Sequence, residues 1–485
     1  MNSKLKNKIF LDVIDQKADL IGNLSDAVWD AAETAFTEYK SADVLCNALQ
    51  QEGFEVQRGL AGIDTAFSAR FGQGKPVVGI LAEFDALSGL SQVSGCCTKT
   101  PLTPGGNGHG CGHHLLGAGS FGAAVAVKEY LQQTKQPGTV IYFGCPGEEG
   151  GSGKAFMAGA HVFDECDFCI TWHPGDTNAV NGYSSLANYQ VLYKFDGVSA
   201  HAAAAPHLGR GALDAVTLMN VGIQFLREHV VPEARMHYAV TDTGGFSPNV
   251  VQPHAEVLYL LRAPETPQVQ EIFERVNDIA QGAALMTGTK MSYDFIKACS
   301  NIVPNNVLGH QLYQSLCNIT PPTLTEQERE YIQSMHDTVE QGTSPLEMYS
   351  KLLKDEEKKQ LEAHSADIYY DFVVPYVPVD EVMPGSSDVG DVSWVCPTAQ
   401  ITTATWFAGT PGHSWQTVSQ GKGSVAKKAT VYAAKVMADT CIKIMQDPDR
   451  IKEAKEELKT RLKGGSYRCP IPEGVKPRAI DPNKK

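Results

Sequence analysis

The chain has 485 residues, of which 42% are hydrophobic and 20% charged, a composition typical of a globular protein with a sizeable core. Its formal net charge of −14 disfavours nucleic acid and anionic membranes as principal partners, since both bind clustered Lys and Arg. We therefore expect a small-molecule substrate. A chain of this length exceeds the size at which one core keeps growing, so we also expect more than one domain.

The first residues and the cysteines bear on the cellular compartment. Residues 1–25 lack the apolar core of a signal peptide, and no apolar run approaches the roughly 18 residues of a membrane span. The 12 cysteines follow no regular spacing, and Cys96 and Cys97 are adjacent, so we expect free thiols. These features predict a cytoplasmic protein without a membrane partner.

Up to about Ser185, helical stretches alternate with short apolar runs. Such alternation predicts an α/β fold, with a mainly parallel sheet that has helices on both faces. The expected helical stretches are Leu20–Gln50 and Leu115–Gln133, and the expected strands are Pro76–Leu81, Thr139–Phe143 and Phe168–Thr171.

From about residue 186 the pattern changes. Tyr189–Phe195 and Val257–Arg262 are typical of strands, and Leu213–Glu228 between them is typical of an amphipathic helix. We therefore expect a smaller α+β domain, a two-layer sandwich, inserted into the α/β domain.

The α/β pattern returns after this insertion. We expect a charged helical insertion over about 322–372, a strand at Gln400–Phe407 and a closing helix at Ser424–Gln446. The tail from Gly464 is rich in Pro and Lys and is expected to be irregular. The predicted division is 1–185 for the first part of the catalytic domain, 186–297 for the inserted domain and 298–485 for the second part.

Two carboxylates end the apolar segment Val77–Asp85. Glu83 and Asp85 point the same way because strand side chains alternate with period two. Either carboxylate could serve a metal site or cap the following loop.

The segment Gly105–Leu116 (GGNGHGCGHHLL) places His109, Cys111, His113 and His114 on a glycine-rich loop that opens a helix. Thiolate and imidazole are the donors that zinc and similar ions prefer. The alternation of His, Cys and His can aim Cys111 and His113 at one centre, so we expect both to bind metal. His114 and His109 could equally be structural.

The turn within Thr139–Gly153 (TVIYFGCPGEEGGSG) carries the adjacent acids Glu148 and Glu149. Their repulsion near a core falls if one binds a cation while the other, with a raised pKa, takes and returns a proton. A surface acid pair is the alternative, which the flanking glycines disfavour.

Two histidines complete the pattern. His173 lies at the end of Phe168–Pro174 (FCITWHP), and His413 lies in the turn Trp406–Gln416 (WFAGTPGHSWQ). A lone histidine is more often structural than a ligand. Open α/β sheets, however, bind ligands at the carboxyl ends of their strands, so four motifs at such ends favour one shared site.

These motifs resemble the aminoacylase and glutamate-carboxypeptidase family of co-catalytic metallopeptidases, in its branch of auxin-conjugate and hippurate hydrolases, which share a Cys-Gly-His motif. His114 departs from the family, which usually has Asn or Asp there. The resemblance covers most of the chain and is carried by Gly108–His113, Cys145–Lys154, Thr171–Pro174, His207–Met219 and Ser386–Trp394.

The resemblance implies an active site with two divalent metal ions, Zn2+ or Mn2+. Glu148 would be the general base for hydrolysis of an amide bond, and Asp85 would orient a ligand without binding metal. The implied ligands are Cys111 as the bridge, His113, Glu149, His173 and His413.

The resemblance also implies that the inserted domain is a lid and dimerisation domain. His201 would stabilise the oxyanion of the tetrahedral intermediate, often across a dimer interface, although it could instead be a helix-capping surface histidine. Asn249 and Arg262 would hold the free carboxylate of the substrate, which an arginine fork suits. The chain would form a homodimer or a heteromer with a related subunit.

The implied activity is hydrolysis of an N-acyl or N-aroyl amino acid. The leading example is p-aminobenzoyl-glutamate, cleaved to p-aminobenzoate and glutamate in the breakdown of folates. One alternative is a dipeptidase for β-alanyl or basic-residue dipeptides. Another is a non-catalytic metal-binding partner subunit, which the presence of Glu148 disfavours.

Overall fold

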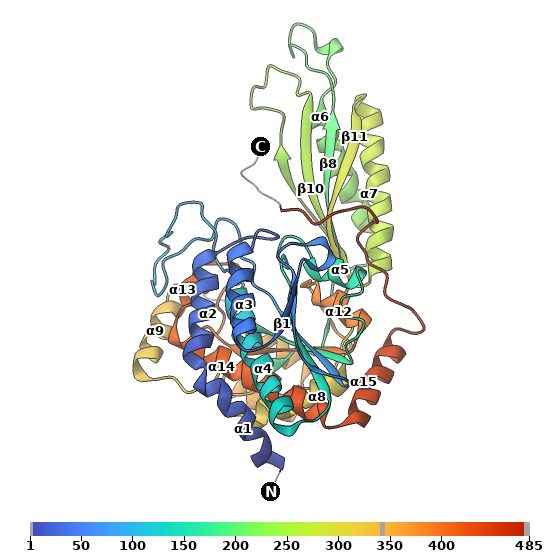
Figure 1. The fold of residues 1–485 in the computed structure, drawn as a ribbon. Coiled ribbons are helices and arrows are strands. Elements are labelled where there is room, and N and C mark those ends of the chain that lie inside the picture. The colour runs from blue at the N-terminus through green and yellow to red at the C-terminus, as the bar shows by residue number, and fades with distance from the viewer. Residues whose placement is uncertain (1–2, 340–344, 480–485) are drawn as a thin grey trace.

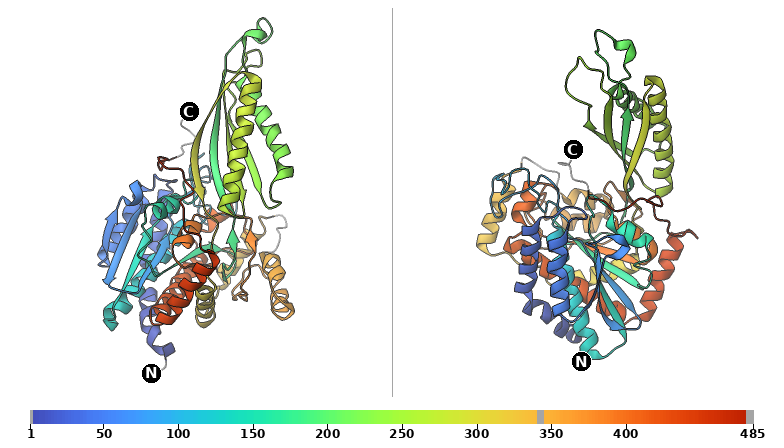
Figure 2. Two further views of the ribbon diagram at one scale, coloured as in Figure 1. Left: turned by 90° about the vertical axis from the view of Figure 1, so that its right-hand side faces the viewer. Right: turned by 45° about the horizontal axis from the view of Figure 1, so that its top comes forward.

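The protein is described by a computed structural model over residues 3–339 and 345–479, and it has two parts, each built on its own sheet. The sheet of the larger body has seven strands, and the sheet of the smaller unit has four. Figure 1 shows the smaller unit standing on one side of the body, and the two views of Figure 2 show it projecting away. We call this smaller unit the lid.

The sheet of the body is mainly parallel, as predicted. Its parallel centre consists, in spatial order, of β4 (Gly138–Gly144), β3 (Val77–Ala82), β5 (Phe168–Gly175) and β13 (Thr398–Ala404). Antiparallel strands extend it at both edges, namely β1 (Glu55–Arg58) and β2 (Phe67–Gln73) beside β4, and β6 (Ala179–Val180) beside β13.

Strand β3 shows why the central strands are apolar throughout. Val78 and Ile80 belong to one hydrophobic core, and Val77 and Leu81 belong to another. Because neighbouring side chains of a strand point to opposite faces, a strand covered on both faces needs apolar residues at every position.

Helices supply the residues that cover these two faces. The core with Val78 includes residues of α1 (Ser3–Gln16), α2 (Ala18–Ala31), α3 (Tyr39–Gln51), α4 (His113–Thr134), α8 (Asn306–Asn318), α14 (Ser424–Met445) and α15 (Pro448–Arg461). The opposite core includes residues of α5 (Gly153–Gly159) and α12 (Val389–Val395).

The lid is a two-layer α+β sandwich, as predicted. Its antiparallel sheet has the order β11 (Lys290–Cys299), β8 (Ala187–Asp196), β10 (His254–Ala263) and β9 (Arg235–Asp242). Helices α6 (Ala212–Leu226) and α7 (Thr266–Thr287) share one core with the sheet, in which Tyr193 and Leu261 are fully buried.

Two predicted segments differ from the structure. The stretch Leu20–Gln50 is two helices, because Ala32 takes a left-handed conformation with φ 42° after α2, and α3 begins only at Tyr39. The charged stretch is helical in α9 (Glu326–His336), α10 (Pro345–Leu352) and α11 (Asp355–Glu362), with 340–344 outside the described residues. It also buries apolar side chains such as Ile332 and Tyr349, so it is more than a solvated surface.

Short elements complete the fold. They are the parallel pair β7 (Ser184–Ser185) and β12 (Val382–Met383), helix α13 (Trp415–Gln420) and the 3-10 turns Leu60–Gly62, Pro206–Leu208 and Arg227–His229. All 12 cysteines are free thiols, as expected. Over residues 3–339 and 345–479, no helix combines the length and the apolar character needed to cross a membrane.

Candidate metal centre

The carboxyl ends of the parallel strands meet at one edge of the sheet, where ligand sites of α/β proteins form. Asp85 follows β3, and the Glu148 and Glu149 pair follows β4. His173 lies in the last part of β5, and His413 follows β13. The sequence-predicted residues of the body therefore converge because their strands are parallel and adjacent.

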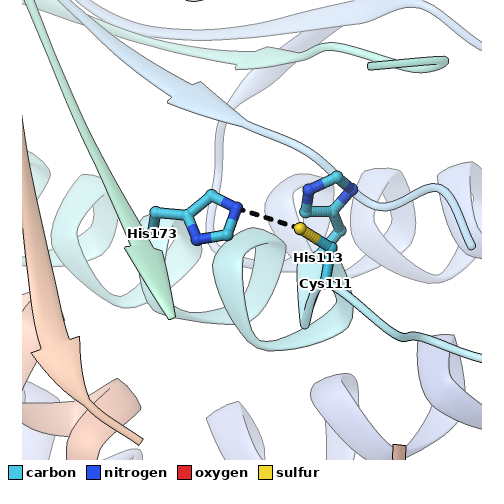
Figure 3. Close-up of side chains that lie close together, drawn as sticks. All are labelled: Cys111, His113 and His173. Atoms are coloured by element: carbon cyan, nitrogen blue, oxygen red, sulfur yellow. Dashed lines mark hydrogen bonds between the residues drawn. The ribbon is translucent and has the colours of Figure 1, made fainter. Parts of the chain in front are cut away.

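Three overlapping groups of donor atoms lie at this edge, and within each group the atoms are no more than 4.8 Å apart. Figure 3 shows the first group, with the Sγ of Cys111 3.4 Å from the Nε2 of His173. Cys111 and His113 each occur in two of the groups. The groups are Cys111, His113 and His173; Cys111, Glu149 and His413; and His113, Glu148 and Glu149.

The rings of His113 and His173 are oriented by partners that leave one nitrogen free. The Nδ1 of His113 lies 2.8 Å from the Oδ1 of Asp85, and the Nδ1 of His173 lies 2.7 Å from the carbonyl oxygen of Pro174. Such partners fix the tautomer of a metal-binding histidine and direct its Nε2 to the cation. The Oδ2 of Asp85 accepts a hydrogen bond from the amide of Glu149 at 2.9 Å, so this one carboxylate joins two of the motifs.

The donor set fits a divalent cation. The Nε2 of His113 and the Oε1 of Glu149 are buried, and within the part of the chain that the structure describes they have only ion-pair contacts, with Glu83 at 3.1 Å and His413 at 3.3 Å, and no hydrogen bond. A buried polar atom without a partner costs about 1–3 kcal/mol, and a cation would remove that cost. Thiolate, imidazole and carboxylate together suit zinc, and carboxylate-containing sites also take manganese.

Cys111 is electrostatically prepared to act as a thiolate. Burial and the charge of Glu149 raise the pKa of its thiol, but the neighbouring His173 and His113 outweigh them and lower the pKa to about 6. The thiol lies just before α4, and a helix N-terminus also favours a thiolate. Gly112 starts that helix at φ 81°, where an added Cβ would lie 2.9 Å from Trp406.

The two adjacent acids differ in their protonation. Burial, together with the charges of Glu83 and Glu149, holds the pKa of Glu148 well above its ordinary value. Burial also opposes ionisation of Glu149, but the adjacent His413 and the charge of His113 keep its pKa below the ordinary value. One acid can therefore carry a proton while the other stays anionic, an arrangement typical of acid–base sites.

His413 lies on a turn with an unusual backbone. Its φ of 52° is in the left-handed region, which is uncommon for a residue other than glycine. The amide of His413 donates to the carbonyl of Gly110 at 3.1 Å, and the amide of Gly409 donates to Asp176 at 3.0 Å. The first bond holds the turn against the loop of Cys111, and the second holds it against the end of β5. The Nε2 of His413 lies 3.3 Å from the Oε1 of Glu149.

The other two histidines of the glycine-rich loop have structural contacts. The Nε2 of His109 lies 3.0 Å from the carbonyl of Val28, and the Nε2 of His114 lies 3.1 Å from the carbonyl of Gly421. Both rings are fully buried, and burial lowers the pKa of each. Neither belongs to a donor group among the described residues.

The lid residues are not brought together with the metal centre. His201 and Asn249 are exposed on the β8–α6 and β9–β10 loops, which lie at the end of the lid farthest from the body (Figure 1). These loops pair with each other, since the amide of Ala202 donates to the carbonyl of Asn249 at 3.0 Å. Arg262 lies at the other end, where its Nη1 is 3.5 Å from the Oγ of Ser386.

Two buried groups beside the centre were not predicted from the sequence. The carboxylate of Glu38 accepts hydrogen bonds from the amide of Gly147 and the hydroxyl of Thr65, both at 2.9 Å. Burial and the charge of Asp85 raise the pKa of Glu38 to about 8. The second group is Lys154, the last residue of the segment Cys145–Lys154 that carries the resemblance, whereas Glu38 lies in none of the motifs.

A cluster of soft and hard metal donors with a protonatable acid beside it, at the edge of a parallel sheet, is the chemistry of a metal-dependent hydrolase. Comparison with known proteins identifies the family. The sequence pattern of peptidase family M20/M25/M40 matches residues 79–441, and the chain belongs to this family. It is thus a metal-dependent hydrolase that acts on amide bonds.

Similar proteins extend the match over nearly the full length. The chain is 46% identical over 471 residues to a subunit of the p-aminobenzoyl-glutamate hydrolase of Escherichia coli (strain K12), covering 97% of this chain and 98% of the relative. It is 26% identical to an Xaa-Arg dipeptidase of Mus musculus, covering 93% and 91%. A putative aminohydrolase structure from methicillin-resistant Staphylococcus aureus shares the fold, with a TM-score of 0.62, 17% identity and coverage of 90% and 100%.

Proposed function

We propose that the chain hydrolyses p-aminobenzoyl-glutamate to p-aminobenzoate and glutamate. The observation that carries this proposal is the 46% identity to one of the p-aminobenzoyl-glutamate hydrolase subunits over almost the whole of both chains. The donor cluster and the protonatable acid at one sheet edge supply the residues that such a reaction needs.

We propose that the site holds two cations, zinc or manganese. Support comes from the two donor groups that share Cys111, because a shared thiolate can serve both ions. A bound pair polarises the amide carbonyl and acidifies water. The proposed ligands are Cys111, His113, Glu149, His173 and His413.

Glu148 is the proposed general base. In its ionised form, which nearby cations would favour, Glu148 takes a proton from the attacking water, and its raised pKa helps it to hold that proton during the addition to the carbonyl carbon. It then gives the proton to the nitrogen of the glutamate product as the carbon–nitrogen bond breaks. Asp85 takes no part in this transfer, but it keeps the ring of His113 and the main chain of Glu149 in place.

We propose that residues 186–297 act as the lid and dimerisation domain. Strand β9 is an edge strand, and a free edge is a template for pairing with another chain. Exposed apolar side chains lie at this edge, with Val221 49% and Tyr238 48% exposed. In a dimer, His201 and Asn249 of one lid would serve the metal centre of the partner, while Arg262 would bind the substrate carboxylate. The description of the relative as one subunit of its enzyme also supports a heteromer.

The relation to an Xaa-Arg dipeptidase favours a second candidate, a dipeptidase for substrates that end in a basic residue. The two functions differ in the charge of the amino-acid side chain that the pocket accepts. Both use the same metal centre, so only the substrate separates them.

The test is a substrate panel on metal-depleted protein after each metal is restored. Release of amino acid is measured from p-aminobenzoyl-glutamate, p-aminobenzoyl-aspartate, β-alanyl-lysine and an Xaa-Arg dipeptide. We expect turnover of p-aminobenzoyl-glutamate with zinc or manganese and background rates with chelator. Preference for the basic dipeptides would replace the proposed substrate with the second candidate, and no turnover of any substrate would contradict both.

A further inference from the structure

Lys154 is a lysine buried completely beside the metal centre. It lies in the first turn of α5, and its side chain is 0% exposed. Removing an ammonium group from water costs several kcal/mol unless charged partners compensate. Its Nζ lies 2.6 Å from the Oε1 of Glu83 and 2.7 Å from the Oδ1 of Asp388, which are also buried. One buried cation thus joins two buried carboxylates.

Both carboxylate oxygens of Asp388 accept hydrogen bonds from Lys154. Its Oδ1 accepts from the Nζ of Lys154, and its Oδ2 accepts from the main-chain amide of the same residue at 2.9 Å. The position of Lys154 is therefore fixed at both its backbone and its ammonium group. One ammonium and two carboxylates leave a net negative charge in the cluster.

The second oxygen of Glu83 points to the metal centre. Its Oε2 lies 3.1 Å from the Nε2 of His113, and this nitrogen is the one that Asp85 leaves free for a cation. A cation held by His113 would therefore have the negative oxygen of Glu83 beside it. Lys154 holds the Oε1 of Glu83, so only Oε2 remains to face the centre.

We propose that Glu83 is a further carboxylate of the metal centre, facing the cation at His113, and that Lys154 is the positioning residue that aims it. The inference rests on the proposed metal centre and deepens it. A purely structural role for the cluster would need the contacts of Lys154 with Glu83 and Asp388 but would not need the contact with His113.

The first test is Glu83→Gln, which keeps the shape of the side chain and an oxygen for Lys154 but removes the charge. Metal content and affinity are measured by elemental analysis and chelator competition on the purified full chain. We expect the affinity for one of the two ions to fall about 10- to 100-fold, the range for groups that support a metal ligand. Two ions bound with wild-type affinity would overturn the proposal.

A matched control is Glu52→Gln. Glu52 likewise pairs with two basic side chains, at 2.6 Å from Lys17 and 3.1 Å from Lys128. Lys128 lies roughly 22 Å along α4 from His113, so this control removes a similar ion pair far from the centre. We expect unchanged affinity for both ions. An equal loss of metal affinity in the control would show that Glu83→Gln acts through general destabilisation, and it would overturn the proposal.

The second test addresses the aiming of Glu83. Replacing Lys154 alone would leave two buried carboxylates unpaired, so the test is the double variant K154M/D388N, which removes one charge of each sign. We expect the same selective loss of one ion with Glu83 intact. Wild-type affinity in the folded double variant would overturn the role of Lys154.

The failure of this inference is distinguishable from that of the proposed function. If the wild-type protein binds no ion, and Cys111→Ser changes nothing, the proposed metal centre itself fails. If the wild-type protein binds two ions and Glu83→Gln binds them equally well, only the role of Glu83 fails.

Discussion

The body and the lid present their candidate residues in opposite ways. In the body, donors from four segments lie within 4.8 Å of one another in overlapping groups, and Asp85 holds two of them, His113 and Glu149, in place. In the lid, His201 and Asn249 are exposed at the tip, and Arg262 lies at the base. One chain thus brings its candidate metal donors together but leaves its candidate substrate-binding residues apart.

This difference separates two physical requirements. A metal centre needs several donors in fixed geometry, which a rigid sheet edge supplies within one chain. Groups that contact the substrate can come from a mobile domain or a second chain, because they act only after the substrate has bound. Substitutions in the body and in the lid should therefore change different measured properties of the protein.

The largest effect is expected for Glu148→Gln in the body. Loss of the proton-accepting group should lower kcat by about 10²- to 10⁴-fold. Metal content should stay at the wild-type level, because the ligands remain. Steady-state kinetics and elemental analysis check this, with Glu165→Gln, a surface acid paired with Arg70, as the control. Wild-type activity in Glu148→Gln would remove this residue from the mechanism.

In the lid, His201→Ala should lower kcat by about 10²- to 10³-fold, the usual effect of removing one oxyanion donor. Mixing inactive His201→Ala and Glu148→Gln chains should restore about a quarter of the activity if sites are completed across a symmetric dimer. Recovery is measured after subunit exchange. A mixture as inactive as its components would show that the sites are not shared between chains.

A smaller effect, on metal binding, is expected for Asp85→Asn. The amide cannot accept from both His113 and Glu149 as the carboxylate does, so metal affinity should fall about 10- to 100-fold. Chelator competition measures the affinity. Asp43→Asn, at an exposed pair with Arg58, serves as the control and should bind metal normally. An unchanged affinity in Asp85→Asn would show that His113 needs no orienting partner.

The smallest effect is expected for Arg262→Ala at the base of the lid. KM should rise about tenfold, which corresponds to ~1.4 kcal/mol, with metal content unchanged. For a substrate whose α-carboxylate is converted to an amide, the variant and the wild type should have the same KM. An equal increase in KM for both substrates would show that Arg262 does not bind the carboxylate.

Local sequence was sufficient to predict the residues that lie in short motifs, because such motifs indicate both their chemistry and their position in the fold. The loop of Cys111 and His113, the acids Glu148 and Glu149, and the strands before them follow from donor type, glycine content and apolar runs. The break after Ala31 was not predictable in this way, because the helical pattern continues while one residue adopts a left-handed backbone.

The sequence by itself determined which side chains can bind metal. It also determined that they follow parallel strands and so lie at one edge of the sheet, because strand periodicity and chain direction are local properties. Tertiary structure alone decided that Glu83, Lys154 and Asp388 meet, because they come from three distant segments and a buried ion cluster depends on all three. It also decided that His201 stands far from the metal centre of its own chain. Contacts between segments distant in sequence carry no spacing pattern, so only the folded arrangement reveals them.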